Sequence, residues 1–80
     1  MFSHYLQAAL NHAAYEILPD GEGFYGRVPP CPGVCAMAET LEACRTALIE
    51  ALEGWILLRV HLNLPLPTID EVQLVVEKVA

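Results

Sequence analysis

Three cysteines are the residues of this chain whose type and spacing could hold a metal or do redox chemistry. Cys31 and Cys35 lie in the segment RVPPCPGVCA, which also contains three prolines and one glycine. Structural zinc sites usually need four Cys or His ligands, often arranged as two closely spaced pairs. Cys31 and Cys35 could form one pair, but Cys44 falls on the apolar side of a predicted helix and the three histidines are scattered. We therefore predict packed or loop cysteines, with no metal and no cofactor.

A row of carboxylates is the second feature that could do chemistry. Helical spacing places Glu42, Thr46, Glu50 and Glu53 on one side of the same predicted helix. Such a row could belong to a metal site or a hydrolase, but it is also the usual pattern of a solvated helix surface. A surface that docks a basic partner is a further interpretation. We predict these four residues as partner-binding residues, and we predict no catalytic residue.

The elements that must position these groups follow from hydrophobic spacing. Apolar residues recur at helical spacing over residues 3–12, which predicts a short amphipathic helix. The segments AYEIL and FYGRV are rich in strand formers and flank the loop PDGEG, a pattern that predicts a hairpin. Proline cannot donate to a strand ladder, so PPCPG is predicted as a connection and VCAMA as a third strand.

From Thr40 the period becomes helical, with Thr40 as the expected N-cap. The predicted apolar side carries Leu41, Cys44, Leu48, Leu52 and Trp55, flanked by Ile56 and others. The helix is predicted to end near Leu62, before Pro65 and Pro67. The valine-rich segment VQLVVEKV is predicted as a last strand.

An amphipathic helix must cover one face of the resulting sheet. The predicted fold class is therefore a two-layer α+β domain. A short N-terminal helix precedes a β-β-β-α-β core, with an antiparallel meander and one long helix packed on the sheet. We predict a single domain over residues 1–80, with the N-terminal helix in residues 1–12 and the core in residues 14–78.

Composition narrows the classes of function. The net charge of −6 disfavours direct contact with nucleic acid and suits a basic protein partner or simple solubility. No stretch reaches the roughly 20 apolar residues of a membrane span, and the first residues lack the basic region of a signal peptide. An odd number of cysteines suits a reducing compartment, so we predict a cytoplasmic protein. The hydrophobic content of 55% and the adjacent Leu57 and Leu58 predict a homo-oligomer, either a dimer or a tetramer.

A series of short motifs resembles the HicB family of antitoxins over residues 14–70. The motifs are Asp20-Gly21, Tyr25-Gly26, Pro29 through Pro32-Gly33, Thr40-Leu41-Glu42, Cys44-Arg45, Trp55-Ile56 and Pro65-Leu66-Pro67. Two positions depart from the family pattern. Cys31 and Cys35 stand where an apolar or aromatic residue is expected, and Glu39 stands where glycine often precedes the threonine.

The resemblance implies a fold, a partner and a mechanism. The family's core is likened to a truncated RNase H fold, and its members typically neutralise HicA, a small basic mRNA-cleaving toxin, by covering its active surface. No acidic constellation accompanies Glu16 on the first strands, so we expect no nuclease activity. Many relatives carry a C-terminal DNA-binding segment. The chain leaves no room for one after its last predicted strand, so direct DNA binding is not expected.

The prediction is therefore an antitoxin-type protein, not an enzyme, which binds and occludes a small basic HicA-like ribonuclease. Two alternatives remain open. The first is a self-associating structural domain without a toxin partner. The second is a small metal- or ligand-binding enzyme, with zinc held through Cys31 and Cys35.

Overall fold

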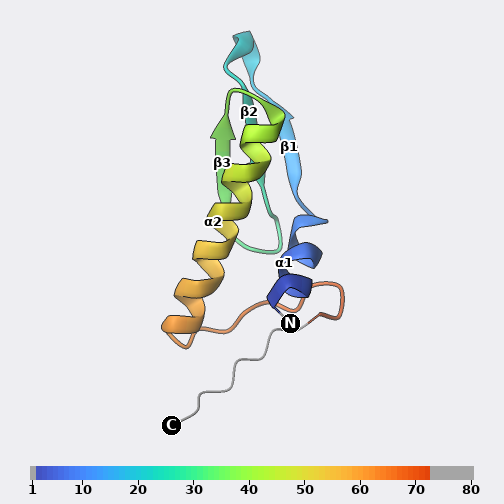
Figure 1. Cartoon of the computed structure of the whole chain (residues 1–80). Helices are drawn as coiled ribbons and strands as arrows, with labels where there is room; N and C mark the ends of the chain where they lie inside the picture. Colours follow the sequence, from blue (N-terminus) through green and yellow to red (C-terminus); the bar gives the residue numbers. More distant parts are fainter. Residues whose placement is uncertain (1, 73–80) are drawn as a thin grey trace.

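The protein is built in two layers, with one long helix lying across a small antiparallel sheet (Figure 1). The structure is a computed structural model and describes residues 2–72. Its elements are α1 (Phe2–Leu10), β1 (Ala14–Ile17), the 3-10 turn η1 (Pro19–Gly21), β2 (Phe24–Arg27), β3 (Cys35–Ala38) and α2 (Leu41–His61). The predicted α+β class is confirmed. The predicted last strand, VQLVVEKV, lies almost wholly outside the described residues.

The three strands form the predicted meander in the order β1-β2-β3, with both pairs antiparallel. Two neighbouring rows of partners across the sheet are Glu16–Tyr25–Met37 and Tyr15–Gly26–Ala36. Alternate residues of a strand point to opposite faces, so the first row lies on one face and the second row on the other. Helix α2 covers the face that carries the second row, because the thiol of Cys44 lies 3.7 Å from the carbonyl oxygen of Ala36.

The proline-rich connection between β2 and β3 consists of two consecutive tight turns. The Cys31 N–H donates to the Val28 carbonyl, and the Val34 N–H donates to the Cys31 carbonyl. A proline follows the first residue of each turn, where its fixed φ is already the one required. Gly33 has a φ of 92°, a conformation that residues with a side chain rarely adopt. The connection is thus the rigid bend that the sequence predicts.

Helix α2 begins and ends with recognisable caps. The Thr40 hydroxyl accepts a hydrogen bond from the Ala43 N–H at 3.1 Å, which confirms the predicted N-cap. At the other end Asn63 has a φ of 58° and donates to Val60, while the Leu64 N–H donates to the Arg59 carbonyl. This pair of bonds is a Schellman motif with asparagine in the left-handed position. The helix therefore ends before Pro65 through its own cap.

The buried side of α2 repeats every fourth residue. Its fully buried side chains are Cys44, Leu48, Leu52 and Ile56. The prediction that Leu41 shares this side is wrong, since Leu41 is exposed, whereas Trp55 is half-buried and packs against the core. Near the first of these residues the helix comes close to the sheet at Gly26. A Cβ atom added there would lie 3.2 Å from the Cys44 Sγ and 3.0 Å from the Tyr15 ring.

The second half of α2 packs on α1 and on the chain that follows α2. Tyr5 and Ala9 of α1 and Ile69 of the following segment are buried in one cluster with Leu52 and Ile56. The Tyr5 hydroxyl donates to the Pro67 carbonyl, and His12 Nε2 lies 2.7 Å from Asp70 Oδ1. Figure 1 shows this following segment running beside α1 at the end of the molecule opposite the β1–β2 turn.

The segment after α2 contains a further tight turn, which the sequence analysis did not predict. Ile69 and Val72 exchange both backbone hydrogen bonds, and the two residues between them, Asp70 and Glu71, have φ angles of 50° and 65°. Two successive residues with positive φ define a type I′ turn, which usually carries asparagine or glycine at these positions.

Candidate functional site

The outer side of α2 carries the residues predicted to bind a partner. Glu42, Thr46 and Glu50 are exposed or partly exposed and follow one another at intervals of four residues. The Thr46 hydroxyl donates to the Glu42 carbonyl at 3.1 Å, so the threonine is turned back onto the helix. Glu53, the fourth predicted residue, is partly exposed. Within residues 2–72 none of these glutamates forms an ion pair, so their charges are directed at solvent.

A group of exposed leucines lies at the C-terminal end of α2 and just after it. Their side chains are between 45% and 60% exposed, and they are Leu57, Leu58, Leu62 and Leu64. Leu57 and Leu58 were predicted as interface residues, and the structure leaves both uncovered. The outer surface of α2 is therefore acidic near its N-terminus and apolar near its C-terminus.

The cysteines lie in three different surroundings. Cys31 is completely buried in the core, and Cys44 is buried between α2 and the sheet. Cys35 is exposed at the start of β3, on the face that α2 does not cover. Among residues 2–72 no group of three or more Cys, His, Asp or Glu side chains is close enough to hold a metal ion. Cys31 is thus a packing residue of the proline bend.

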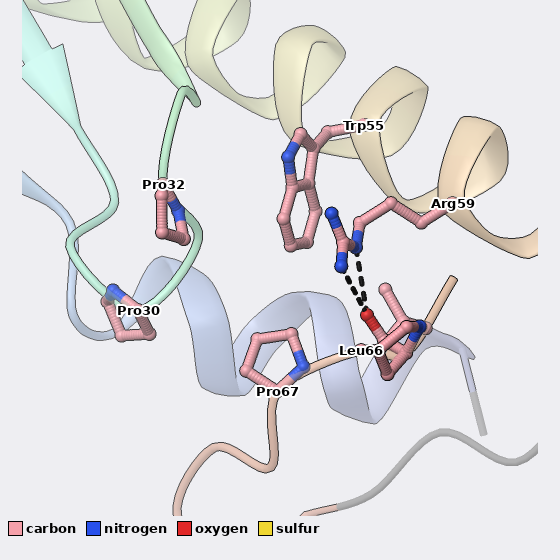
Figure 2. A pocket seen from close by; sticks show the side chains of 7 residues that line it. Pro30, Pro32, Trp55, Arg59, Leu66 and Pro67 are labelled. Atoms are coloured by element: carbon pink, nitrogen blue, oxygen red, sulfur yellow. Dashed lines mark hydrogen bonds between the residues drawn. The ribbon is translucent and has the colours of Figure 1, made fainter.

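A pocket of about 410 Å³ lies between the proline bend, α2 and the segment after α2 (Figure 2). Four prolines form much of its wall, two from the bend and two from the later segment: Pro30, Pro32, Pro65 and Pro67. Leu66 adds an aliphatic side chain. Trp55 and Arg59 enter from α2, one helical turn apart. Figure 2 shows the indole of Trp55 standing opposite Pro32 and Pro30 across the opening.

The Arg59 side chain is held in a fixed position at this pocket. Its guanidinium carbon lies 4.9 Å from the centre of the Trp55 ring, which is a cation–π arrangement. Arg59 Nε and Nη2 both donate to the Pro65 carbonyl, at 2.9 and 2.7 Å. Arg59 thereby connects the end of α2 to the segment that returns towards α1.

Two buried groups lie near Arg59 and remain neutral at physiological pH. Burial raises the pKa of the Tyr5 phenol to about 12, and the nearby Cys31 thiol adds to the shift. Burial also raises the pKa of the Cys31 thiol. The positive charge of Arg59 acts in the opposite direction on both groups, but it does not outweigh burial. Among the described residues that line the pocket, Arg59 is therefore the one with a formal charge.

The sequence analysis did not predict this pocket, because its walls come from three segments that are distant in sequence. Trp55 was assigned to the core, and the prolines were interpreted only as a bend and a helix stop. One signal was present in the sequence. The sole tryptophan of the chain stands one helical turn before an arginine, and the next proline pair follows shortly after.

The fold is that of a small α+β domain, and the chain belongs to the UPF0150-like family, which matches residues 4–67. This small family is associated with toxin–antitoxin systems and is related to the HicB-like antitoxins. The match covers the three strands, α2 and all seven residues that line the pocket. The chain is accordingly a small antitoxin-like protein.

One similar solved structure is described as the crystal structure of TTHA0281 from Thermus thermophilus. The two chains are 34% identical, the TM-score is 0.89, and the alignment covers 96% of this chain and 95% of that one. No curated protein matches this chain. In the part of the chain that the structure describes, no helix has the length and hydrophobicity needed to cross a membrane.

Proposed function

We propose that this chain is an antitoxin-type protein that binds a small basic ribonuclease of the HicA type and occludes its active surface. The mechanism is stoichiometric and not catalytic. The observation that carries the proposal is the exposed row of carboxylates on α2 in a chain of the UPF0150-like family. Glu42 and Glu50 lie on the same side of a rigid helix and have no cationic partner within residues 2–72.

Electrostatics supports a basic partner in particular. The chain carries a net charge of −6, so its field attracts a cationic protein and raises the rate of encounter. An RNA-cleaving enzyme needs a positive surface to bind phosphates. A protein that covers such a surface must present negative charge to it, and the outer side of α2 does so without rearrangement.

The first step is to sequence the gene next to the one that encodes this chain, and the test is co-expression with the small basic protein that the proposal expects this neighbour to encode. We expect the chain to restore growth to cells that are arrested by that neighbour, and to co-purify with it in a fixed ratio. The double variant Glu42→Lys/Glu50→Lys should lose both effects, because it places two positive charges against a positive surface. Arg45→Lys on the same helix is the matched control and should behave like the wild type.

Two results would contradict the proposal. Growth arrest that persists when the wild-type chain is present in excess excludes an antitoxin function. Full rescue by the double charge-reversal variant excludes the outer side of α2 as the docking surface. Circular dichroism of both variants shows whether a loss of rescue reflects a loss of folding.

A second candidate function, self-association, is supported by the exposed leucines of α2. Their exposure is unusual for a small monomer and typical of a subunit interface. We propose that these leucines bury one another between copies of the chain. Light scattering should give a dimer or tetramer for the wild type and a smaller species for Leu58→Glu/Leu62→Glu. An unchanged mass for this variant would exclude the leucines as the interface.

A further inference from the structure

The pocket beside Trp55 has an unusual polar composition, because its free side-chain groups are donors. The Trp55 indole N–H has no acceptor within hydrogen-bonding distance among residues 2–72. Arg59 uses two of its nitrogens on Pro65 and retains Nη1. Figure 2 shows the indole nitrogen on the side of the ring that faces Pro32.

Two carbonyl acceptors of the same wall are already engaged. The Pro65 carbonyl receives two hydrogen bonds from Arg59, and the Pro67 carbonyl receives one from Tyr5. The lining prolines have no N–H of their own. A peptide that placed backbone N–H groups against these two carbonyls would compete with hydrogen bonds that are already made. This side of the pocket therefore favours a ligand that offers carbonyl acceptors and few donors.

A proline-rich segment has this composition. In the polyproline II conformation its carbonyls are not bonded internally, its prolines have no N–H, and its rings present flat apolar surfaces. Aromatic-lined grooves are the usual receptors for such segments, because the conformation is already fixed before binding. A volume of about 410 Å³ holds a few side chains of a peptide, and it lies within the range of roughly 300–1,000 Å³ found for ligand pockets.

The positive charge of the pocket further restricts the class of ligand that it can bind. Arg59 is the cation of the pocket, and among residues 2–72 no carboxylate lies within ion-pair distance of it. Tyr5 and Cys31 behind it are neutral because burial raises the pKa of each. A carboxylate next to the prolines of a ligand would meet a guanidinium that Trp55 and Pro65 already hold in place. Little side-chain freedom is lost when such an ion pair forms.

We propose that this pocket binds a proline-rich segment of another protein in the polyproline II conformation, with its prolines on Trp55 and a neighbouring carboxylate on Arg59. The inference goes beyond the proposed function, because it concerns a surface made of different residues from the acidic row. It also assigns that surface a ligand of opposite charge to the basic ribonuclease. The two proposals can therefore fail separately.

The fluorescence of Trp55 provides the test, because it is the only tryptophan of the chain. The full chain is titrated with the blocked peptide APPLPPEA, and the emission of the indole is recorded. We expect a saturable change of the emission. The peptide APPLPPKA, with the charge reversed, should bind at least tenfold more weakly. The peptide AAALAAEA keeps the carboxylate without the prolines and should give no saturation at the same concentrations.

Variants locate the binding site. Arg59→Gln should remove the difference between the acidic and basic peptides, while Arg45→Gln, at an exposed position of the same helix, should leave all affinities unchanged. The double variant Glu42→Lys/Glu50→Lys should bind APPLPPEA with wild-type affinity, which separates this test from that of the antitoxin proposal. Circular dichroism checks that Arg59→Gln still folds.

Several results would overturn the inference, and the wild-type chain alone can give three of them. These are the absence of any saturable response to APPLPPEA, equal binding of the acidic and basic peptides, and equal binding of the peptide without prolines. A fourth result comes from the variant Leu58→Glu/Leu62→Glu, which lacks the proposed leucine interface. If its Trp55 emission still changes with protein concentration in the absence of peptide, a second copy of the chain is the occupant, and this also overturns the inference.

Discussion

The two halves of α2 pack against different parts of the molecule. The first half lies on the sheet, where Cys44 and Leu48 are fully buried and Gly26 allows close approach, and its outer side is acidic. The second half extends past the sheet, where Ile56 is buried against other elements and the outer side carries exposed leucines. Figure 1 shows this change of neighbours along the helix.

One continuous helix therefore supports two separate surfaces, for which we propose two different partners. The first half packs on regular strands, and its outer residues are polar. The second half is supported by the proline bend and the returning chain, and these irregular segments leave a pocket beside Trp55. Irregular segments that are held by a rigid element are common places for binding sites.

The largest effect is expected where the two halves share their core. Leu48→Ala removes a fully buried side chain and should lower the free energy of unfolding by about 2–5 kcal/mol. At a dilution where the chain is monomeric, Leu57→Ala, on the exposed side of the second half, should change it by less than about 0.5 kcal/mol. Urea denaturation measures both. Similar losses at the two positions would mean that Leu57 is covered in solution.

Replacement of a glycine by alanine should have opposite effects on stability in β2, beneath the first half of α2, and within α2 itself. Gly26→Ala places a methyl group against Tyr15 and Cys44 and should cost about 1–3 kcal/mol. Gly54→Ala, within α2, meets nothing within 4 Å and should stabilise the protein by up to about 1 kcal/mol. Thermal unfolding followed by circular dichroism gives both values. A neutral Gly26→Ala would show that the helix is further from the sheet than described.

Alkaline pH should lower the stability of the core around the second half of α2. The unfolded chain ionises Cys31 near pH 9 and Tyr5 near pH 10, whereas burial raises the pKa of both groups in the folded state, that of Tyr5 to about 12. Stability from these neutral groups is therefore complete below about pH 9 and is lost as the pH rises towards 12. Urea denaturation across this range should show a smaller decline for Tyr5→Phe. Parallel declines would assign the loss to other groups.

The smallest effect is expected in the turn after α2. Glu71 has a positive φ that glycine adopts without strain, so Glu71→Gly should stabilise the protein by about 0.5 kcal/mol. Glu71→Ala is the matched control, because alanine removes the charge but keeps the strain. Equal melting temperatures for the two variants would rule out strain as the cause.

Much of the fold could be predicted from the sequence because it depends on local patterns. The three strands of the meander, the bend and the N-cap at Thr40 follow from spacing and from residues with special backbone preferences, and the structure confirms them. The sequence could not show which of Trp55 and Ile56 is more deeply buried, since both lie near the apolar side of an ideal helix. Their burial depends on the elements that pack against the helix there, which cover Ile56 and leave Trp55 at the pocket.

The candidate sites divide in the same manner. The position of Glu42, Thr46 and Glu50 on the outer side follows from helical periodicity, and their role in docking stays a prediction. The pocket depends on contacts between segments that are remote in sequence, and no local pattern reports such contacts. Cys31 shows the same limit, because spacing alone does not tell whether a residue of a bend points into the core. The turn at Asp70 and Glu71 lacks the glycine or asparagine that usually marks it.

The contacts of Tyr5 with Pro67 and of His12 with Asp70 join residues 62 and 58 positions apart. They close the chain into a ring, and the cost of closing a ring grows with its length. The meander and α2 depend on contacts between elements that follow one another in sequence, so we expect them to form first. The contacts between α1 and the segment after α2 should form last, and they should also break first in native-state fluctuations. We therefore expect the docking of α1 to be the slow step in the folding of an otherwise fast-folding domain.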